Sequence, residues 1–131
     1  MIKKIFKDLN QNKLRYCHWK SNSHLDKSFK GKTDFDLLVD PDHIEKFEDL
    51  VRKNGFKKRY SSLDKVYPSV MDYVGFDENS GKLFHLHIHT KLIFGQKYFK
   101  SYRIPLEVSI LNSAFINKEY NDIKTIEPEY E

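Results

Sequence analysis

The sequence has little cysteine and no long hydrophobic run, and each absence excludes a class of protein. Its single cysteine, Cys17, cannot form a disulfide within the chain, so a disulfide framework is excluded and a reducing cytoplasm is the expected setting. No apolar stretch approaches the roughly 20 residues of a membrane-spanning helix. The N-terminal MIKKIFKDLN lacks the continuous apolar segment of a signal peptide. We therefore expect a cytoplasmic protein without a membrane partner.

Charge of one sign is not in large excess either. The 23 basic and 19 acidic residues are interspersed and leave a net charge of +4, which is too little for a dedicated nucleic-acid surface. A mildly basic chain suits a polyanionic small ligand such as a nucleotide, and equally an ordinary solvated surface. The 131 residues, 39% hydrophobic and 15% aromatic, are enough for one compact domain with a packed core.

The spacing of apolar residues predicts a mixed α/β (α+β) domain over residues 1–131. Helical spacing occurs near residues 2–12, 21–30 and 41–54, and again from Pro105, where Leu106, Ile110 and Leu111 are expected to face inward. Asp40 is the expected N-cap of the third helix and Gly55 the residue after its end. Strands are expected near 15–19, 33–39, 56–61, 70–76 and 82–92, the last two joined by a turn at 78–81. Residues 95–102 are expected to form a loop, and residues 120–131 a domain boundary or tail, so the chain is predicted to be the N-terminal part of a longer protein.

Two acids open one of the expected strands, in the stretch GKTDFDLLVD. Because side chains alternate along a strand, Asp34 and Asp36 face one side of the sheet, and Phe35, Leu37 and Val39 face the other. Two neighbouring carboxylates suit a hard cation, Mg²⁺ or Mn²⁺. Two solvated acids at the beginning of a strand are the ordinary alternative, because the Asp-x-Asp pattern by itself has little specificity.

Three histidines alternate with aliphatic residues in FHLHIHTKL, so His85, His87 and His89 share one face of a strand. They span about 13 Å of strand, too far for all three to bind one ion. We expect one or two to face the site and the others to support them, the alternative being a polar strand facing solvent. Asp72, on the strand expected to pair across the turn, would join them if it faces the same side, although an exposed strand acid is the more ordinary interpretation.

Small polar residues precede the acidic strand at a loop-to-helix junction. The backbone N–H groups around Ser21 and Asn22, flanked by Lys20 and followed later by Lys32, are suited to a phosphate. Helix capping by Ser21, Asn22 or Ser23 and solvation of the lysines are the ordinary alternatives.

Together these stretches resemble a known superfamily. The junction Lys20-Ser21-Asn22, then GKTDFDLLV about a dozen residues later, then a further strand with ligand-type side chains, is similar to the DNA polymerase beta-like nucleotidyltransferases. More narrowly, WKSN, GKTDFDLLVD and DYVGFDENSGKLFHLHIHTKLIFG resemble an uncharacterised bacterial nucleotidyltransferase-like family with an HLHVH strand, across residues 14–107. In some members this domain precedes a kinase-like domain with a phosphate-binding loop.

The chain departs from the superfamily pattern in two places. Lys20 replaces the glycine that normally precedes the serine, and the third acid is missing from the histidine strand, where His87 takes its place. Fewer carboxylates provide less charge for two Mg²⁺ ions, which favours a site with one metal, one that uses Mn²⁺ or Zn²⁺, or an inactive one.

The resemblance implies a transferase that moves a nucleoside monophosphate from a nucleoside triphosphate to an unknown hydroxyl acceptor. It implies that Asp34, Asp36 and His87, with His89, hold Mg²⁺ or Mn²⁺ and form the catalytic site, and that Lys20, Ser21, Asn22 and Lys32 bind the triphosphate. The alternative is a catalytically degenerate module that binds a nucleotide or sugar phosphate and serves a partner such as a C-terminal kinase-like domain. A histidine-rich phosphohydrolase would need His18, His24 and His43 to converge, and no spacing supports this.

Overall fold

The computed structural model describes residues 1–63, 66–94 and 102–130. The helices are α1 (Ile2–Gln11), α2 (Leu25–Phe29), α3 (Ile44–Lys53) and α4 (Glu107–Ser113), with 3₁₀ helices η1 (Asn22–His24), η2 (Pro41–His43), η4 (Lys118–Tyr120) and η5 (Pro128–Tyr130). The strands are β1 (Tyr16–His18), β2 (Phe35–Val39), β3 (Lys57–Arg59), β4 (Val70–Asp77), β5 (Lys82–His89), β6 (Ile93–Phe94), β7 (Tyr102–Arg103), β8 (Phe115–Asn117) and β9 (Ile123–Thr125). The predicted α+β class is confirmed.

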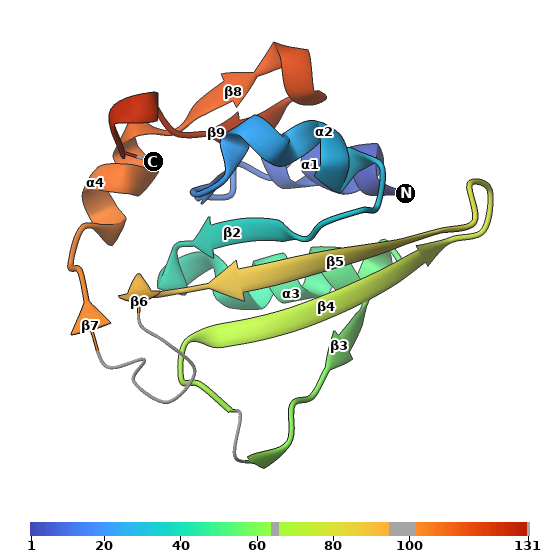
Figure 1. Cartoon of the computed structure of the whole chain (residues 1–131), viewed down its shortest axis with the longest axis horizontal. Coiled ribbons are helices and arrows are strands. Elements are labelled where there is room, and N and C mark those ends of the chain that lie inside the picture. Colours follow the sequence, from blue (N-terminus) through green and yellow to red (C-terminus); the bar gives the residue numbers. More distant parts are fainter. Residues whose placement is uncertain (64–65, 95–101, 131) are drawn as a thin grey trace.

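A seven-stranded mixed sheet organises the molecule, with the strand order β3-β4-β5-β2-β1-β9-β8 (Figure 1). β4 and β5 form the predicted antiparallel hairpin, and β5 then runs parallel to β2. Parallel neighbours cannot be joined by a tight turn, and here the chain from β2 to β5 passes through α3 and the outer strands β3 and β4. A separate two-stranded sheet pairs β6 with β7.

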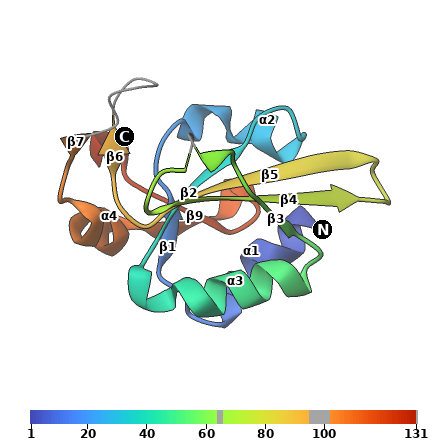
Figure 2. The ribbon, with the colours of Figure 1, turned by 90° about the horizontal axis from the view of Figure 1, so that it is seen from below.

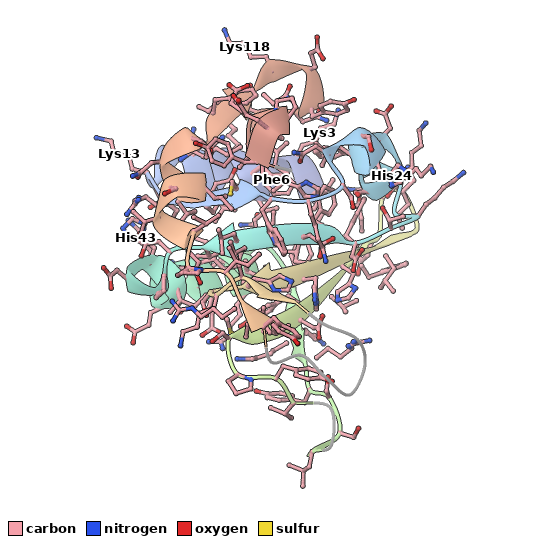
Figure 3. The ribbon with its side chains drawn as sticks, turned by 60° about the vertical axis from the view of Figure 1, so that its left-hand side comes forward. Lys3, Phe6, Lys13, His24, His43 and Lys118 are labelled. Carbon is pink, nitrogen blue, oxygen red and sulfur yellow. The ribbon has the colours of Figure 1, made fainter. Side chains whose placement is uncertain are left out.

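One face of the sheet is covered by helices α1 and α3, which lie on the same side of it (Figure 2). The β2 side chains of Phe35, Leu37 and Val39 pack there in the main core. The helices contribute the buried side chains that their spacing predicted, among them Ile2, Ile5, Phe6, Leu9, Phe47 and Val51. Figure 3 shows Phe6 inside the body of the protein, whereas Lys13 and Lys118 point away from it.

The opposite face is apolar over only part of its width. Leu38 of β2 and Cys17 of β1 form a second core with Ile110 and Leu111 of α4. The rest of this face, over the beginning of β2 and over β5 and β4, carries the acids and histidines described below. The alternation predicted for β2 is therefore confirmed, with its two sets of side chains on opposite faces.

Local signals placed several boundaries correctly. The Asp40 carboxylate accepts a hydrogen bond from the backbone N–H of Asp42 at 3.0 Å, so it caps the helical segment as predicted. Gly55 follows α3 with φ +86°, a conformation that glycine adopts without the steric cost of a Cβ. The predicted strand at 56–61 is limited to β3, and the strand predicted at 82–92 ends at His89.

Other expectations need correction at the C-terminal side. Leu106 precedes α4 and is 45% exposed, so its predicted inward position is wrong. The segment 120–131, expected as a boundary or tail, contributes β9, which lies inside the sheet between β1 and β8. β8 and β9 were not predicted. Of the loop expected at 95–102, residues 95–101 lie outside the described residues, and Tyr102 begins β7.

None of the helices in residues 1–63, 66–94 and 102–130 has the length and apolar character needed to cross a bilayer.

Candidate functional site

Four acidic and basic side chains lie in one row across neighbouring strands. Asp36 of β2 is the direct cross-strand partner of His87 of β5, and His87 is the direct partner of Asp72 of β4. Arg59 of β3 is in turn opposite Asp72. The register therefore gathers charged residues from four strands on the face opposite the main core. The prediction that Asp34, Asp36 and His87 lie on one face of the sheet is confirmed, since Asp34 contacts His85 on that face.

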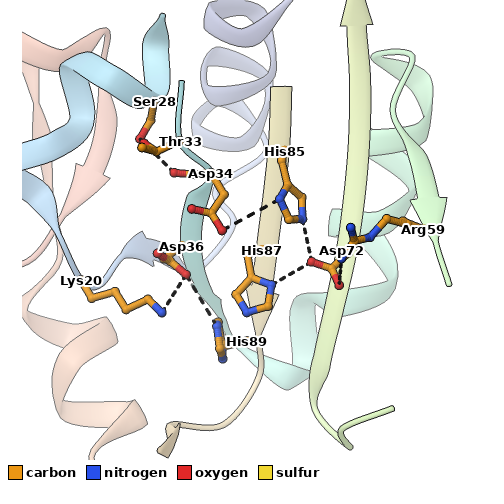
Figure 4. Close-up of polar contacts among 10 residues, drawn as sticks. All are labelled: Lys20, Ser28, Thr33, Asp34, Asp36, Arg59, Asp72, His85, His87 and His89. Carbon is orange, nitrogen blue, oxygen red and sulfur yellow. Dashed lines mark hydrogen bonds and ion pairs between the residues drawn. The ribbon is translucent and has the colours of Figure 1, made fainter. Parts of the chain in front are cut away.

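Eight side chains make up this site, which we call the polar cluster (Figure 4). It consists of Lys20, Asp34, Asp36, Arg59, Asp72, His85, His87 and His89.

Asp72 is the most heavily contacted acid of the polar cluster. One of its oxygens, Oδ1, lies 2.6 Å from His85 Nε2 and 2.8 Å from His87 Nδ1, while Oδ2 lies 3.5 Å from Arg59. Burial alone would raise the pKa of Asp72, but the hydrogen bonds from the two imidazoles hold it far below its usual range. Asp72 is therefore an ionised acceptor, and each ring nitrogen that faces it carries the proton.

This proton assignment also determines which nitrogen of each neutral ring is unprotonated. With Nδ1–H of His87 donated to Asp72, a neutral ring presents a bare Nε2, which lies on the side toward His89 (Figure 4). A carboxylate behind a histidine in this way orients the ring and increases the basicity of a metal-ligating nitrogen. His85 donates its Nε2–H to Asp72 in the same way, so the unprotonated nitrogen of the neutral His85 ring is Nδ1, which lies 3.9 Å from Asp34 Oδ2.

A first possible metal-binding group consists of Asp36, His87 and His89, whose ligand atoms lie within 4.8 Å of one another. Asp36 is 7% exposed and His89 3% exposed, and the ring of Trp19 packs edge-on against His89 at 5.2 Å. Two imidazoles and one carboxylate suit transition cations such as Mn²⁺ or Zn²⁺ better than Mg²⁺, which prefers oxygen ligands. The donors present therefore fit one divalent cation.

A second group, Asp72, His85 and His87, meets the same distance criterion. Its atoms already satisfy one another, because Asp72 accepts from both rings and contacts Arg59. His87 belongs to both groups and turns Nδ1 toward the second. We therefore take the first group as the candidate metal centre and the second as the structure that holds His87 in place.

Asp34 lies at the edge of this centre, since it belongs to neither group among the described residues. Its carboxylate is about two-fifths exposed and faces His85. The loop behind it is fixed by Ser28, whose hydroxyl donates to the Asp34 carbonyl and contacts the Thr33 hydroxyl, both at 2.9 Å. Asp34 and Asp36 also line a small pocket of about 130 Å³ beside Ser21.

The four residues predicted to bind phosphate differ in position. Lys20 reaches the site and places Nζ 3.0 Å from Asp36 Oδ1. Ser21 lines the small pocket with φ +58°, a left-handed conformation that costs a non-glycine residue about 1–2 kcal/mol. The Asn22 side chain contacts His18 at 2.6 Å. Lys32 is exposed and, in the described part of the chain, is not among the residues that line the pocket.

A larger pocket of about 410 Å³ lies on the other side of His87. His87 and Asp72 form its wall toward the candidate metal centre, and Arg59, Tyr60 and Tyr67 contribute to its lining. Its size is in the range of sites for small organic ligands. The histidine strand therefore separates two concave surfaces, of which the smaller is polar.

The histidines needed for a phosphohydrolase do not converge. His18 and His24 line the small pocket, but His43 lies on the opposite side of the molecule from His24 (Figure 3). There its Nδ1 accepts the backbone N–H of Arg15 at 2.9 Å. The structure gives this alternative no common site.

Two residues of the polar cluster have a more central position in the site than the sequence indicated. Asp72 is 8% exposed rather than a solvated strand acid, and it supplies a third carboxylate one strand beyond the expected position. Arg59, which lies opposite Asp72, belongs to no pattern in the sequence that predicted a site. The turn between Asp77 and Lys82 could have identified the cross-strand partner of Asp72, because counting back along the hairpin pairs position 72 with position 87.

No family model, no curated protein and no solved structure matches this chain.

Proposed function

We propose that the protein is a cytoplasmic, metal-dependent nucleotidyltransferase, which moves a nucleoside monophosphate from a nucleoside triphosphate to a hydroxyl acceptor. The observation that carries the proposal is the row Asp36, His87 and Asp72, with His89 beside it. Asp36 of this row lines the small pocket together with Ser21, which supports a phosphate ligand beside the cation. A divalent cation bound there would stabilise the charge on the attacking and leaving oxygens.

The protein's own side chains divide the remaining tasks. Asp36, His87 and His89 would hold the cation, with Asp72 orienting His87. Lys20 and the backbone at Ser21 would contact the triphosphate, because Lys20 contacts Asp36 and Ser21 lines the small pocket together with Asp36. Positive charge and exposed N–H groups beside a carboxylate-bound cation are the usual way to hold a phosphate chain.

The transfer step needs a base, and His85 has the geometry for one. The acceptor oxygen forms a bond to the α-phosphorus, and the bond to the bridging oxygen breaks so that its electron pair leaves with pyrophosphate. The hydroxyl proton passes to Nδ1 of His85, which is bare when Nε2–H is donated to Asp72. The resulting imidazolium would lie between two carboxylates, Asp72 at 2.6 Å and Asp34 at 3.9 Å.

A second candidate function is a module that binds a nucleotide or sugar phosphate without reacting, for a partner such as a kinase-like domain. One observation favours it. The residue between Asp36 and Asp72 is an imidazole and not a carboxylate, so the row has less negative charge than three adjacent acids would supply. Such a site would bind a phosphate ligand through Lys20 and Ser21 while lacking charge for the transfer.

The test is pyrophosphate release from a panel of nucleoside triphosphates with Mn²⁺ or Mg²⁺. The parent protein should release pyrophosphate, and His85→Gln should reduce the rate by about 10²–10⁴-fold, the usual contribution of a general base. Asp49→Asn is the matched control, because Asp49 is an exposed acid on α3, on the other face of the sheet. Saturable binding of a triphosphate without release would support the module, and absence of both binding and release would refute both functions.

A further inference from the structure

The polar cluster has a nearly balanced charge before any cation binds. Its three carboxylates are opposed by two permanently charged side chains, Lys20 at 3.0 Å from Asp36 and Arg59 at 3.5 Å from Asp72. With neutral imidazoles the cluster has a formal charge of −1. One divalent cation would reverse this charge, and a second would leave a strongly positive cluster in a partly buried place, which is unfavourable.

Lys20 lies where a second cation would share the Asp36 carboxylate. Its ammonium contacts Asp36 Oδ1, the oxygen that also lies 3.9 Å from His89 Nε2; in Figure 4 Lys20 approaches this oxygen from the left, and His87 and His89 lie to its right. The Asp36 side chain is 11% exposed and that of Lys20 40% exposed, so the contact is sheltered on the acid side only. Nζ also lies 5.2 Å from the Trp19 ring, and Trp19 packs against His89. A cation bound to Asp36, His87 and His89 would therefore share Asp36 Oδ1 with the Lys20 ammonium.

The other place for a second ion is the group formed by Asp72, His85 and His87. An ion there would have to displace two ring protons from Asp72 and would lie close to the Arg59 guanidinium. Two cationic side chains therefore lie at the places where a second metal ion could bind an acid of the cluster. Arg59 lies at Asp72, and Lys20 lies at Asp36.

We propose that each chain binds a single divalent cation, through Asp36, His87 and His89, and that the Lys20 ammonium takes the place of a second cation beside Asp36. In this role Lys20 contacts both the carboxylate and the phosphates of the ligand, which belongs to the nucleoside triphosphates. The triphosphate part rests on the proposed function. The single cation and its competition with Lys20 do not.

The experiment is a titration of the whole chain with Mn²⁺ alone, followed by electron paramagnetic resonance and by calorimetry. The parent should bind one ion per chain. Lys20→Met keeps the length of the side chain and removes its charge, so Mn²⁺ should bind at least about fivefold more tightly, the fold-change that corresponds to two unit charges ~4 Å apart in water. Lys53→Met is the matched control, because Lys53 is an exposed lysine on α3, on the other face of the sheet, and it should leave the affinity unchanged.

A second titration uses a non-hydrolysable nucleoside triphosphate in the presence of Mn²⁺. Here Lys20→Met should act in the opposite direction and weaken binding, because the ammonium no longer contacts the phosphates. Two ions per parent chain, no Mn²⁺ binding, or an unchanged or weaker Mn²⁺ affinity in Lys20→Met would overturn the cation proposal. A third outcome separates the two proposals. If the parent binds one Mn²⁺ ion and Lys20→Met binds it more tightly, but neither protein binds the triphosphate, the single-cation proposal is supported and the nucleotidyltransferase proposal is refuted.

Discussion

Asp72 can be tested as the residue that orients His87 toward a cation. In Asp72→Asn the side chain keeps its shape but loses its charge and one acceptor oxygen. The neutral amide oxygen is a weaker acceptor than the ionised Oδ1, so it would hold less firmly the two ring N–H groups that Asp72 Oδ1 accepts from His85 at 2.6 Å and from His87 at 2.8 Å. The amide NH₂ would also point at Arg59 or at a ring N–H, which is repulsive. The variant should therefore leave His87 free to rotate.

The expected loss of Mn²⁺ affinity follows from this change. Residues that orient a metal-binding histidine contribute about 10–100-fold to metal affinity, which is about 1.4–2.8 kcal/mol of binding free energy. Calorimetry should show a loss in this range for Asp72→Asn. Asp49→Asn, which removes an equal charge from the exposed side of α3, should bind Mn²⁺ as the parent does.

A double-mutant cycle separates an orienting residue from a direct metal ligand. If Asp72 acts through His87, then Asp72→Asn should cost little further affinity in a His87→Ala protein. If Asp72 is itself a ligand, the two losses should add. Additive losses would refute the assignment of Asp72, and so would an Asp72→Asn protein with parental affinity. Circular dichroism of each variant checks that the fold is intact.

Three further predictions concern the acids and the histidine strand. Asp36→Ala should lower Mn²⁺ affinity by at least about tenfold, roughly 1.4 kcal/mol, and parental binding measured by calorimetry would show that this acid is not a ligand. His87→Asp places a carboxylate between Asp36 and Asp72, so pyrophosphate release with Mg²⁺ should rise if the protein is a transferase, and a lower rate than the parent's would count against it. Burial alone would raise the pKa of Glu48, but hydrogen bonds from Tyr73 and Lys58 lower it below its usual value. The ionised Glu48 therefore stabilises the fold above the unfolded pKa of about 4.3, and this stabilisation is lost as the pH falls through the lower pKa of the folded state. Glu48→Gln should therefore lower the free energy of unfolding by about 1–2 kcal/mol at pH 7, with a smaller difference from the parent below pH 4, and urea denaturation that shows the same difference at both pH values would disprove this account.

The sequence by itself determined the faces of the two central strands. Alternation along a strand is a local property, so Asp34 and Asp36 had to face away from Phe35 and Leu37 wherever β2 lay in the sheet. The histidine face of β5 followed in the same way. Helices α1 and α3 were also readable, because Asp40, Gly55 and the apolar spacing act within a few residues of chain.

Only the tertiary structure decided which of these faces meet. The parallel pairing of β2 with β5 sets Asp36 beside His87, and this register depends on the packing of distant segments against α1 and α3 rather than on either strand alone. The same holds for β8 and β9, which are three residues each, too short for a periodic pattern, and pair only because the sheet offers an edge beside β1. Lys20 shows most clearly which contacts could not be predicted from the sequence. The sequence marked it as a charge near a phosphate, and only the folded chain placed its ammonium on Asp36, because the attraction between them acts through space and leaves no pattern in the sequence.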